Sequence, residues 1–215
     1  MTDAIEKVKL LREETSAGVT DVRQALERSG GDVEGARRLL GDQERVVAAE
    51  KGDRETSKGL IEAYAHFNGR IGVLVEVDCE TDFALRTPEV KELARSIALH
   101  VASEDPLAIA PEDVPPEALE EQRAIAEGGA VESGAEDVAE EAIRAHVERF
   151  AAERSLLTQP FVKDSSKTIG DLLRETISKV DENIVVRRFV RYEATGSGSF
   201  CTIVDGRTLI VRDRG

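Results

Sequence analysis

Apolar and polar residues alternate most clearly over residues 71–79, where every odd position is apolar. A period of two predicts a strand with one buried face. The spacing becomes helical after Thr87 and Pro88, a capping hydroxyl followed by a proline that suits the first helical position. Phe83 is therefore predicted to lie on a short loop held at both ends.

Residues 1–41 carry apolar positions at helical spacing that predict three short helices. The second should end at the pair Gly30-Gly31, where left-handed backbone costs little, and the third at Gly41. The predicted inward positions are Ile5, Val8, Leu11, Val22, Ala25, Leu26, Val33, Ala36, Leu39 and Leu40. At about 40 residues, this unit is near the lower limit for independent folding.

Side-chain caps are predicted for the second and third helices at Thr20 and Asp32. Val19 lies in the turn before Thr20. Its position fits an exposed residue and a core contact equally well.

Residues 42–59 are polar and short of large apolar groups, which predicts a partly helical linker. The dipeptide Asn68-Gly69 is a strong hairpin signal, so residues 60–67 should form a strand that pairs with residues 71–79. A further amphipathic helix and a β-branched strand follow, over residues 168–180 and 184–192. The predicted fold class is α+β, with an antiparallel sheet covered by helices on one side.

Residues 116–155 hold 11 carboxylates against four arginines, a net charge of −7 that is half of the chain's −14. The pair Gly128-Gly129 interrupts this segment, and its apolar stripe is thin. The pattern predicts two helices that form a projecting antiparallel hairpin. A merely solvated acidic face is the simpler explanation of the charge.

The C-terminal segment carries a second hairpin signal, Asp205-Gly206, flanked by apolar residues 200–204 and 207–211. This hairpin could extend a sheet shared by two copies of the chain, which we favour, or cap an open edge of a monomer. The predicted organisation is a three-helix domain over residues 1–41, a linker over 42–59, an α+β core over 60–193 that includes the acidic hairpin 116–155, and a C-terminal β-hairpin extension over 194–215.

The charge balance of 29 basic against 43 acidic residues argues against direct nucleic-acid binding and for a protein partner. No apolar run reaches the roughly 20 residues that span a bilayer, and the N-terminus lacks the regions of a signal peptide. Cys79 and Cys201 form no disulfide or metal framework, which suits a reducing compartment. We therefore expect a cytoplasmic protein without a membrane partner.

The residues that carry chemistry are sparse. His66, His100 and His146 lie on separate predicted elements without metal-ligand spacing, and the chain has neither a P-loop nor a nucleophile-elbow motif. We therefore predict no enzymatic activity, no metal site and no cofactor.

Four motifs, in order, resemble those of the bacterial elongation factor Ts family. They are LREETSAGV at residues 11–19, CETDF at 79–83, LLTQPFVKD at 156–164 and ENIVVRRFVRY at 182–192. The resemblance extends over residues 1–193, and each motif alone would be weak evidence.

The resemblance implies a guanine nucleotide exchange factor that binds elongation factor Tu, both GDP-bound and nucleotide-free, with residues 1–41 as a ubiquitin-associated-like domain. It places Thr81, Asp82, Phe83 and Ala84 on a loop that intrudes beside the partner's magnesium site, and Arg12, Val19 and Thr20 where the N-terminal domain touches the partner. Family members usually have asparagine at Asp78, valine and alanine at Ala84 and Leu85, and methionines at Val19 and Thr20.

Three alternatives stay open at this point. Phe83 could instead plug the core, since aromatic residues are usually buried. The chain could also be a general protein-binding adaptor or a small acidic chaperone.

Its single predicted core lobe resembles the short family members that pair as homodimers through an open sheet edge.

Overall fold

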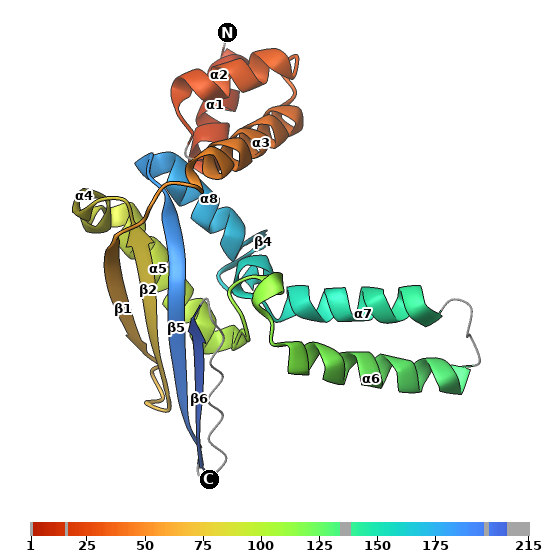
Figure 1. Ribbon diagram of the computed structural model, residues 1–215. Helices are drawn as coiled ribbons and strands as arrows, with labels where there is room; N and C mark the ends of the chain where they lie inside the picture. The colour runs from red at the N-terminus through yellow and green to blue at the C-terminus, as the bar shows by residue number, and fades with distance from the viewer. Residues whose placement is uncertain (1, 16, 134–138, 196–197, 206–215) are drawn as a thin grey trace.

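An antiparallel four-stranded sheet forms the centre of the computed structural model, which describes residues 2–15, 17–133, 139–195 and 198–205 (Figure 1). The strand order is β1-β2-β5-β6, and a two-stranded sheet, β3-β4, lies apart from it. The strands are β1 (Lys58–Ala65), β2 (Ile71–Cys79), β3 (Pro160–Phe161), β4 (Asp164–Thr168), β5 (Ile184–Thr195) and β6 (Gly198–Asp205). The α-helices are α1 (Thr2–Thr15), α2 (Val19–Arg28), α3 (Val33–Lys51), α4 (Asp82–Arg86), α5 (Pro88–Glu104), α6 (Pro116–Ser133), α7 (Ala139–Glu153) and α8 (Ile169–Val180).

The predicted alternation of β2 is confirmed, and it makes this strand the centre of the core. Its inward residues from Val73 to Cys79 are buried and pack with the inner face of α5. Antiparallel partners flank β2 on both sides, β1 and β5, with an irregularity in the second register between Glu76 and Val77. The opposite face of the sheet is open, since Ile61, Leu74 and Tyr192 stay 63%, 49% and 46% exposed. The α+β fold class is therefore as predicted.

The β1–β2 turn follows the chemistry of its sequence. Gly69 adopts a φ of +68°, and its N–H donates to the His66 carbonyl over 2.8 Å. Glycine takes this left-handed conformation at no steric cost, which favours the short connection between the two strands.

Helices α1–α3 pack around a small core of their own, in which Leu11, Val22 and Leu40 are almost completely buried. Gly30 and Gly31 have positive φ angles, as the predicted end of α2 required. The predicted inward position of Ile5 is wrong, because this side chain is 69% exposed near the start of α1.

Two predicted boundaries in this unit are wrong. Helix α2 begins at Val19 after Gly18, so Thr20 is inside the helix and does not cap it. Helix α3 continues through Gly41 to Lys51. A helical glycine costs only about 1 kcal/mol relative to alanine, and the end of α3 gains contacts with α8, including the ion pair of buried Lys51 with Asp181.

The acidic segment forms helices α6 and α7, which lie side by side and project away from the sheet (Figure 1). Helix α6 runs through Gly128 and Gly129 to Ser133, so the predicted interruption at this pair is wrong. The cost of two helical glycines is small, and neither lies among the glycines with positive φ. Gln122 and His146 join the two helices through a hydrogen bond of 3.2 Å.

The C-terminal signal is only partly described by the structure. Strand β6 contains the predicted strand at 200–204 and pairs with β5, with Val190 opposite Ile203. The predicted turn at Gly206 and the strand at 207–211 lie outside the described residues. Among the described helices, none has the length and apolar character that crossing a membrane requires.

A buried histidine ties α5 to the segment that precedes β4. His100 is fully buried, and its Nδ1 accepts a hydrogen bond from the Val162 N–H over 3.3 Å. Its Nε2 must then carry the proton that is shared with Gln159 Oε1 over 3.0 Å. Burial lowers the pKa of His100, because the charged form would be desolvated.

Mild acid should therefore destabilise the fold through His100. The pKa is lower in the folded state, so the unfolded chain binds the proton first, and stability falls as the pH drops below about 6.5. One proton contributes a slope of at most about 1.4 kcal/mol per pH unit. Urea unfolding between pH 5 and pH 8 isolates this slope as the difference between the wild type and His100→Gln, because the opposing contribution of Glu44 is common to both; His66→Gln should give no such difference. Equal slopes in all three proteins would contradict the assignment.

Candidate functional site

The segment after β2 forms a single helical turn whose two ends are capped by threonine hydroxyls. Thr81 is the N-cap of α4, and its Oγ1 accepts from the Ala84 N–H over 3.3 Å. Thr87 ends α4 and begins α5, since its hydroxyl donates to the Ala84 carbonyl over 2.6 Å and accepts from the Val90 N–H over 3.4 Å. The loop predicted at Phe83 is therefore a short, capped helix.

Helix α4 separates its side chains into an inner and an outer set. Ala84 and Leu85 are buried in the main core, whereas Asp82 and Phe83 are exposed. The Phe83 ring is 79% exposed, so it does not plug the core. Thr81 is exposed as well, while Ala84 is fully buried and packs the turn against the main core.

The cysteine at the end of β2 is not a reactive group. Cys79 is buried, and burial together with the nearby carboxylates of Glu182, Asp78 and Glu80 raises the pKa of its thiol to about 12. The thiolate is the nucleophilic form of cysteine. Cys79 therefore acts as a small apolar core residue beneath the loop.

The N-terminal candidates lie on the three-helix unit. Arg12 on α1 and both Val19 and Thr20 at the start of α2 are exposed, which decides between the two positions open for Val19. Figure 1 shows this unit and α4 toward the same end of the sheet, with the acidic hairpin projecting to the side. An exposed aromatic ring and a separate helical surface thus lie toward one end of the molecule.

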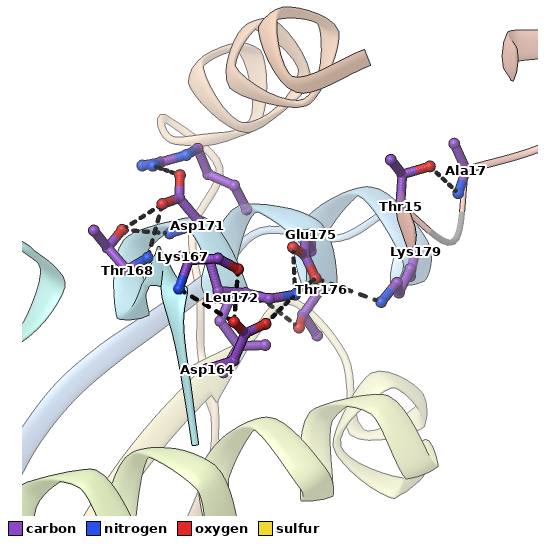
Figure 2. A network of polar contacts seen from close by, with 12 residues as sticks. Thr15, Ala17, Asp164, Lys167, Thr168, Asp171, Leu172, Glu175, Thr176 and Lys179 are labelled. Atoms are coloured by element: carbon purple, nitrogen blue, oxygen red, sulfur yellow. Dashed lines mark hydrogen bonds and ion pairs between the residues drawn. The ribbon is translucent and has the colours of Figure 1, made fainter. Parts of the chain in front are cut away.

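A polar cleft of about 960 Å³ separates the three-helix unit from α8 and β4, with Arg37, Glu44 and Lys167 among its lining residues. Its charges are already paired in large part: Arg37 contacts Glu14, and Lys167 contacts Glu175. Figure 2 shows Glu175 on α8 joined to both Lys167 and Lys179. The cleft is a junction between two structural units, and Phe83 is not among its lining residues.

Partial burial, reinforced by the charge of Glu175, raises the pKa of Glu44 to about 7 in this junction. No group of three or more histidine, cysteine, aspartate or glutamate side chains placed to hold a metal ion occurs in the described part of the chain. The candidate site in the described part of the chain consists of exposed side chains on α4 and on the three-helix unit.

The sequence patterns assign no role to Glu80, Glu182 and Asn183, although all three lie in the motifs CETDF and ENIVVRRFVRY. These residues surround the base of α4 through hydrogen bonds that join positions about 100 residues apart. Only the sheet register, which brings the end of β2 beside the start of β5, reveals them.

The chain is similar to known proteins over most of its length. The sequence model of the family described as Elongation factor TS matches residues 42–193. The protein named Elongation factor Ts from Rubrobacter xylanophilus is 59% identical over 194 residues, which are 90% of this chain and the whole of that protein. Those with the same name from Thermoanaerobacter sp. X514 and Carboxydothermus hydrogenoformans are 44% and 45% identical over 189 residues, 87% of this chain and 93% and 87% of theirs.

The exposure of Phe83 predicts that Phe83→Ala leaves stability within about 0.5 kcal/mol, as is usual for surface changes. Leu85→Ala, on the buried side of the same helix, should cost about 2 to 5 kcal/mol. Thermal and urea unfolding of both variants measure the difference. A destabilised Phe83→Ala protein would mean that the ring contributes to the core in solution.

Proposed function

The chain belongs to the elongation factor Ts family, and on this premise we propose that it is a guanine nucleotide exchange factor for elongation factor Tu. The exposed Phe83 ring carries the proposal, because a capped turn holds this large apolar side chain in solvent, where a pocket of the partner can bury it. The factor binds both the GDP-bound and the nucleotide-free partner, acts in the cytoplasm, and performs no covalent chemistry of its own.

The proposed mechanism acts on the magnesium ion of the partner. In a GTPase, magnesium bridges the bound phosphates and a P-loop hydroxyl, so a shift of the surrounding elements weakens nucleotide binding. Asp82 and Phe83 point into solvent from α4 and are the groups that we place beside this site. Thr81 caps the turn, and the buried Ala84 side chain packs the turn against the core.

A single ring is too little for exchange that is faster by several decades. Burial of one phenylalanine supplies roughly 1.5 to 3 kcal/mol, and each tenfold change in affinity needs about 1.4 kcal/mol. We therefore propose a second contact through Arg12, Val19 and Thr20. Since coupling is reciprocal, bound nucleotide lowers the affinity between the factor and elongation factor Tu by the same ratio.

We retain the proposed division of the chain into functional parts. Residues 1–41 act as a ubiquitin-associated-like domain that docks on the GTPase domain, and residues 42–59 link it to a core over residues 60–193. The continuation of α3 to Lys51 makes the first half of this linker helical. The extension 194–215 contributes β6 to the edge of the core sheet.

Phe83→Ala should slow stimulated GDP release by one to two decades, which corresponds to a hot-spot cost of about 2 kcal/mol. Asp82→Ala should act in the same direction, because its exposed carboxylate can disturb the groups or waters around the magnesium ion. Release of a fluorescent GDP analogue from purified elongation factor Tu measures both effects.

Exposed Phe67, at the far end of the β1–β2 hairpin, offers a matched control for loss of a surface ring. Phe67→Ala should stimulate GDP release from elongation factor Tu at the wild-type rate. Wild-type activity of Phe83→Ala would remove the ring from the mechanism, and a wild-type protein that does not accelerate release would overturn the proposed function. The same assay separates an exchange factor from an adaptor or a chaperone.

We further propose that the protein is a homodimer. The open face of the sheet supports this assembly, because Ile61 and Leu74 line an apolar groove with Val190 on adjacent strands. A second copy of the sheet would cover these side chains from water.

Sedimentation of the full chain should give a mass near twice 23.4 kDa. Leu74→Lys should shift the equilibrium towards monomer, whereas Leu10→Lys, at an exposed leucine of α1, should not. A chain that ends at Glu193 lacks β6 and tests the role of this strand. A monomeric full chain that dimerises only after this truncation would show that the C-terminal segment is a cap.

A further inference from the structure

Two glutamates cross between the end of β2 and the start of β5 at the base of the Phe83 turn. Glu182 follows α8 and reaches the loop, while Glu80 follows β2 and reaches the opposite backbone. The register places Cys79, the last residue of β2, opposite Ile184, the first residue of β5. Glu80 therefore lies beside the residues that precede β5, and Glu182 lies beside the residues that follow β2. The result is a reciprocal clamp of two carboxylates on two backbone N–H groups.

Glu182 uses both of its oxygens on one residue. Its Oε2 accepts from the Thr81 N–H over 3.0 Å, and its Oε1 accepts from the Thr81 hydroxyl over 2.6 Å. The hydroxyl proton is thereby directed to Glu182, which leaves an oxygen lone pair for the Ala84 N–H. Glu182 thus fixes the rotamer of the residue that caps α4.

Glu80 continues the clamp to the linker that carries the three-helix unit. Its Oε1 accepts from the Asn183 N–H over 2.6 Å and lies 3.4 Å from the Arg54 guanidinium. The Asn183 side chain is buried, and its Nδ2 donates to the Arg54 carbonyl over 2.8 Å and to the Gly52 carbonyl over 3.4 Å. One contiguous network therefore joins the turn before α4, the start of β5 and the end of α3.

The turn between α8 and β5 is shaped to present this clamp. Asp181 ends α8 in the left-handed region with a φ of +63°, a conformation that aspartate tolerates better than most residues. The same residue pairs with Lys51 at the end of α3. The position of Glu182 is thus fixed by the helix before it and by the strand after it.

We propose that Glu182 is a positioning residue for nucleotide exchange, which holds the capped turn in the conformation that presents Phe83 and Asp82 to the partner. This inference rests on the proposed function. Hydrogen bonds to an ionised acceptor are stronger than neutral ones, and a turn ordered before binding loses less conformational freedom in the complex. Glu182 itself needs no contact with the partner for this role.

Glu182→Gln is the variant that tests the clamp, because it keeps the size of the side chain and replaces one acceptor oxygen by a donor. The exposed linker residue Glu55 provides the matched charge control, Glu55→Gln. We expect Glu182→Gln to slow stimulated GDP release roughly tenfold and Glu55→Gln to leave it unchanged. Thr81→Val removes the hydroxyl from the other side of the contact and should reproduce the loss.

A double-mutant cycle with Phe83→Ala distinguishes positioning from a direct or general structural role. If Glu182 acts through the turn, Glu182→Gln should slow release much less in the Phe83→Ala background. An equal loss in both backgrounds would overturn the proposal. A wild-type rate for Glu182→Gln in the otherwise unchanged chain would do the same.

Amide hydrogen exchange of the free protein gives a readout that does not depend on the partner. The Thr81 and Ala84 amides should exchange faster in Glu182→Gln, whereas β2 amides such as Val75 should keep their protection. Unchanged protection at Thr81 and Ala84 would overturn the clamp itself. If these amides exchange faster in Glu182→Gln but the wild-type protein does not accelerate GDP release from elongation factor Tu, the clamp stands and the proposed function fails.

Discussion

The burial of one face of β2 against α5 is the constraint on which the rest of the structure depends. β2 has a partner strand on each side, and its inward residues pack into the main core. The position and the direction of the chain at Cys79, where β2 ends, are therefore fixed. Helix α5 begins only nine residues later, at Pro88, so the chain between them has little freedom and closes as one capped turn.

This geometry explains how the fold can keep a large ring in solvent. The turn is anchored from below by Ala84 and Leu85, and its hydrogen bonds are completed by Thr81 and Thr87. Phe83 contributes almost no burial to this arrangement. Its exposure thus occurs on a turn whose caps and buried side chains are held in place.

Local patterns in the sequence were enough to predict β2, the start of α5 and the end of α2, since alternation, a threonine cap and paired glycines act over a few residues. They were not enough for α3, whose extension past Gly41 is stabilised by α8, more than 100 residues away. The candidate site divides in the same way. The turn with Phe83 is readable from its neighbours, but the contact of Glu182 with Thr81 depends on sheet register and loop closure together.

The two junctions of the three-helix unit with the core differ in physical character, and this difference bears on how two contacts could cooperate. The inner junction ends in the ion pair of buried Lys51 with exposed Asp181 and in the hydrogen bonds of buried Asn183, which are directional. The outer junction is a polar cleft in which partial burial and the charge of Glu175 raise the pKa of Glu44. The directional contacts thus lie at the end of α3, whereas the earlier part of the three-helix unit faces the core across a polar cleft. The clamp at Glu80 and Glu182 lies at this same end of α3, so the Phe83 turn and the three-helix unit are attached to the core through one hydrogen-bond network.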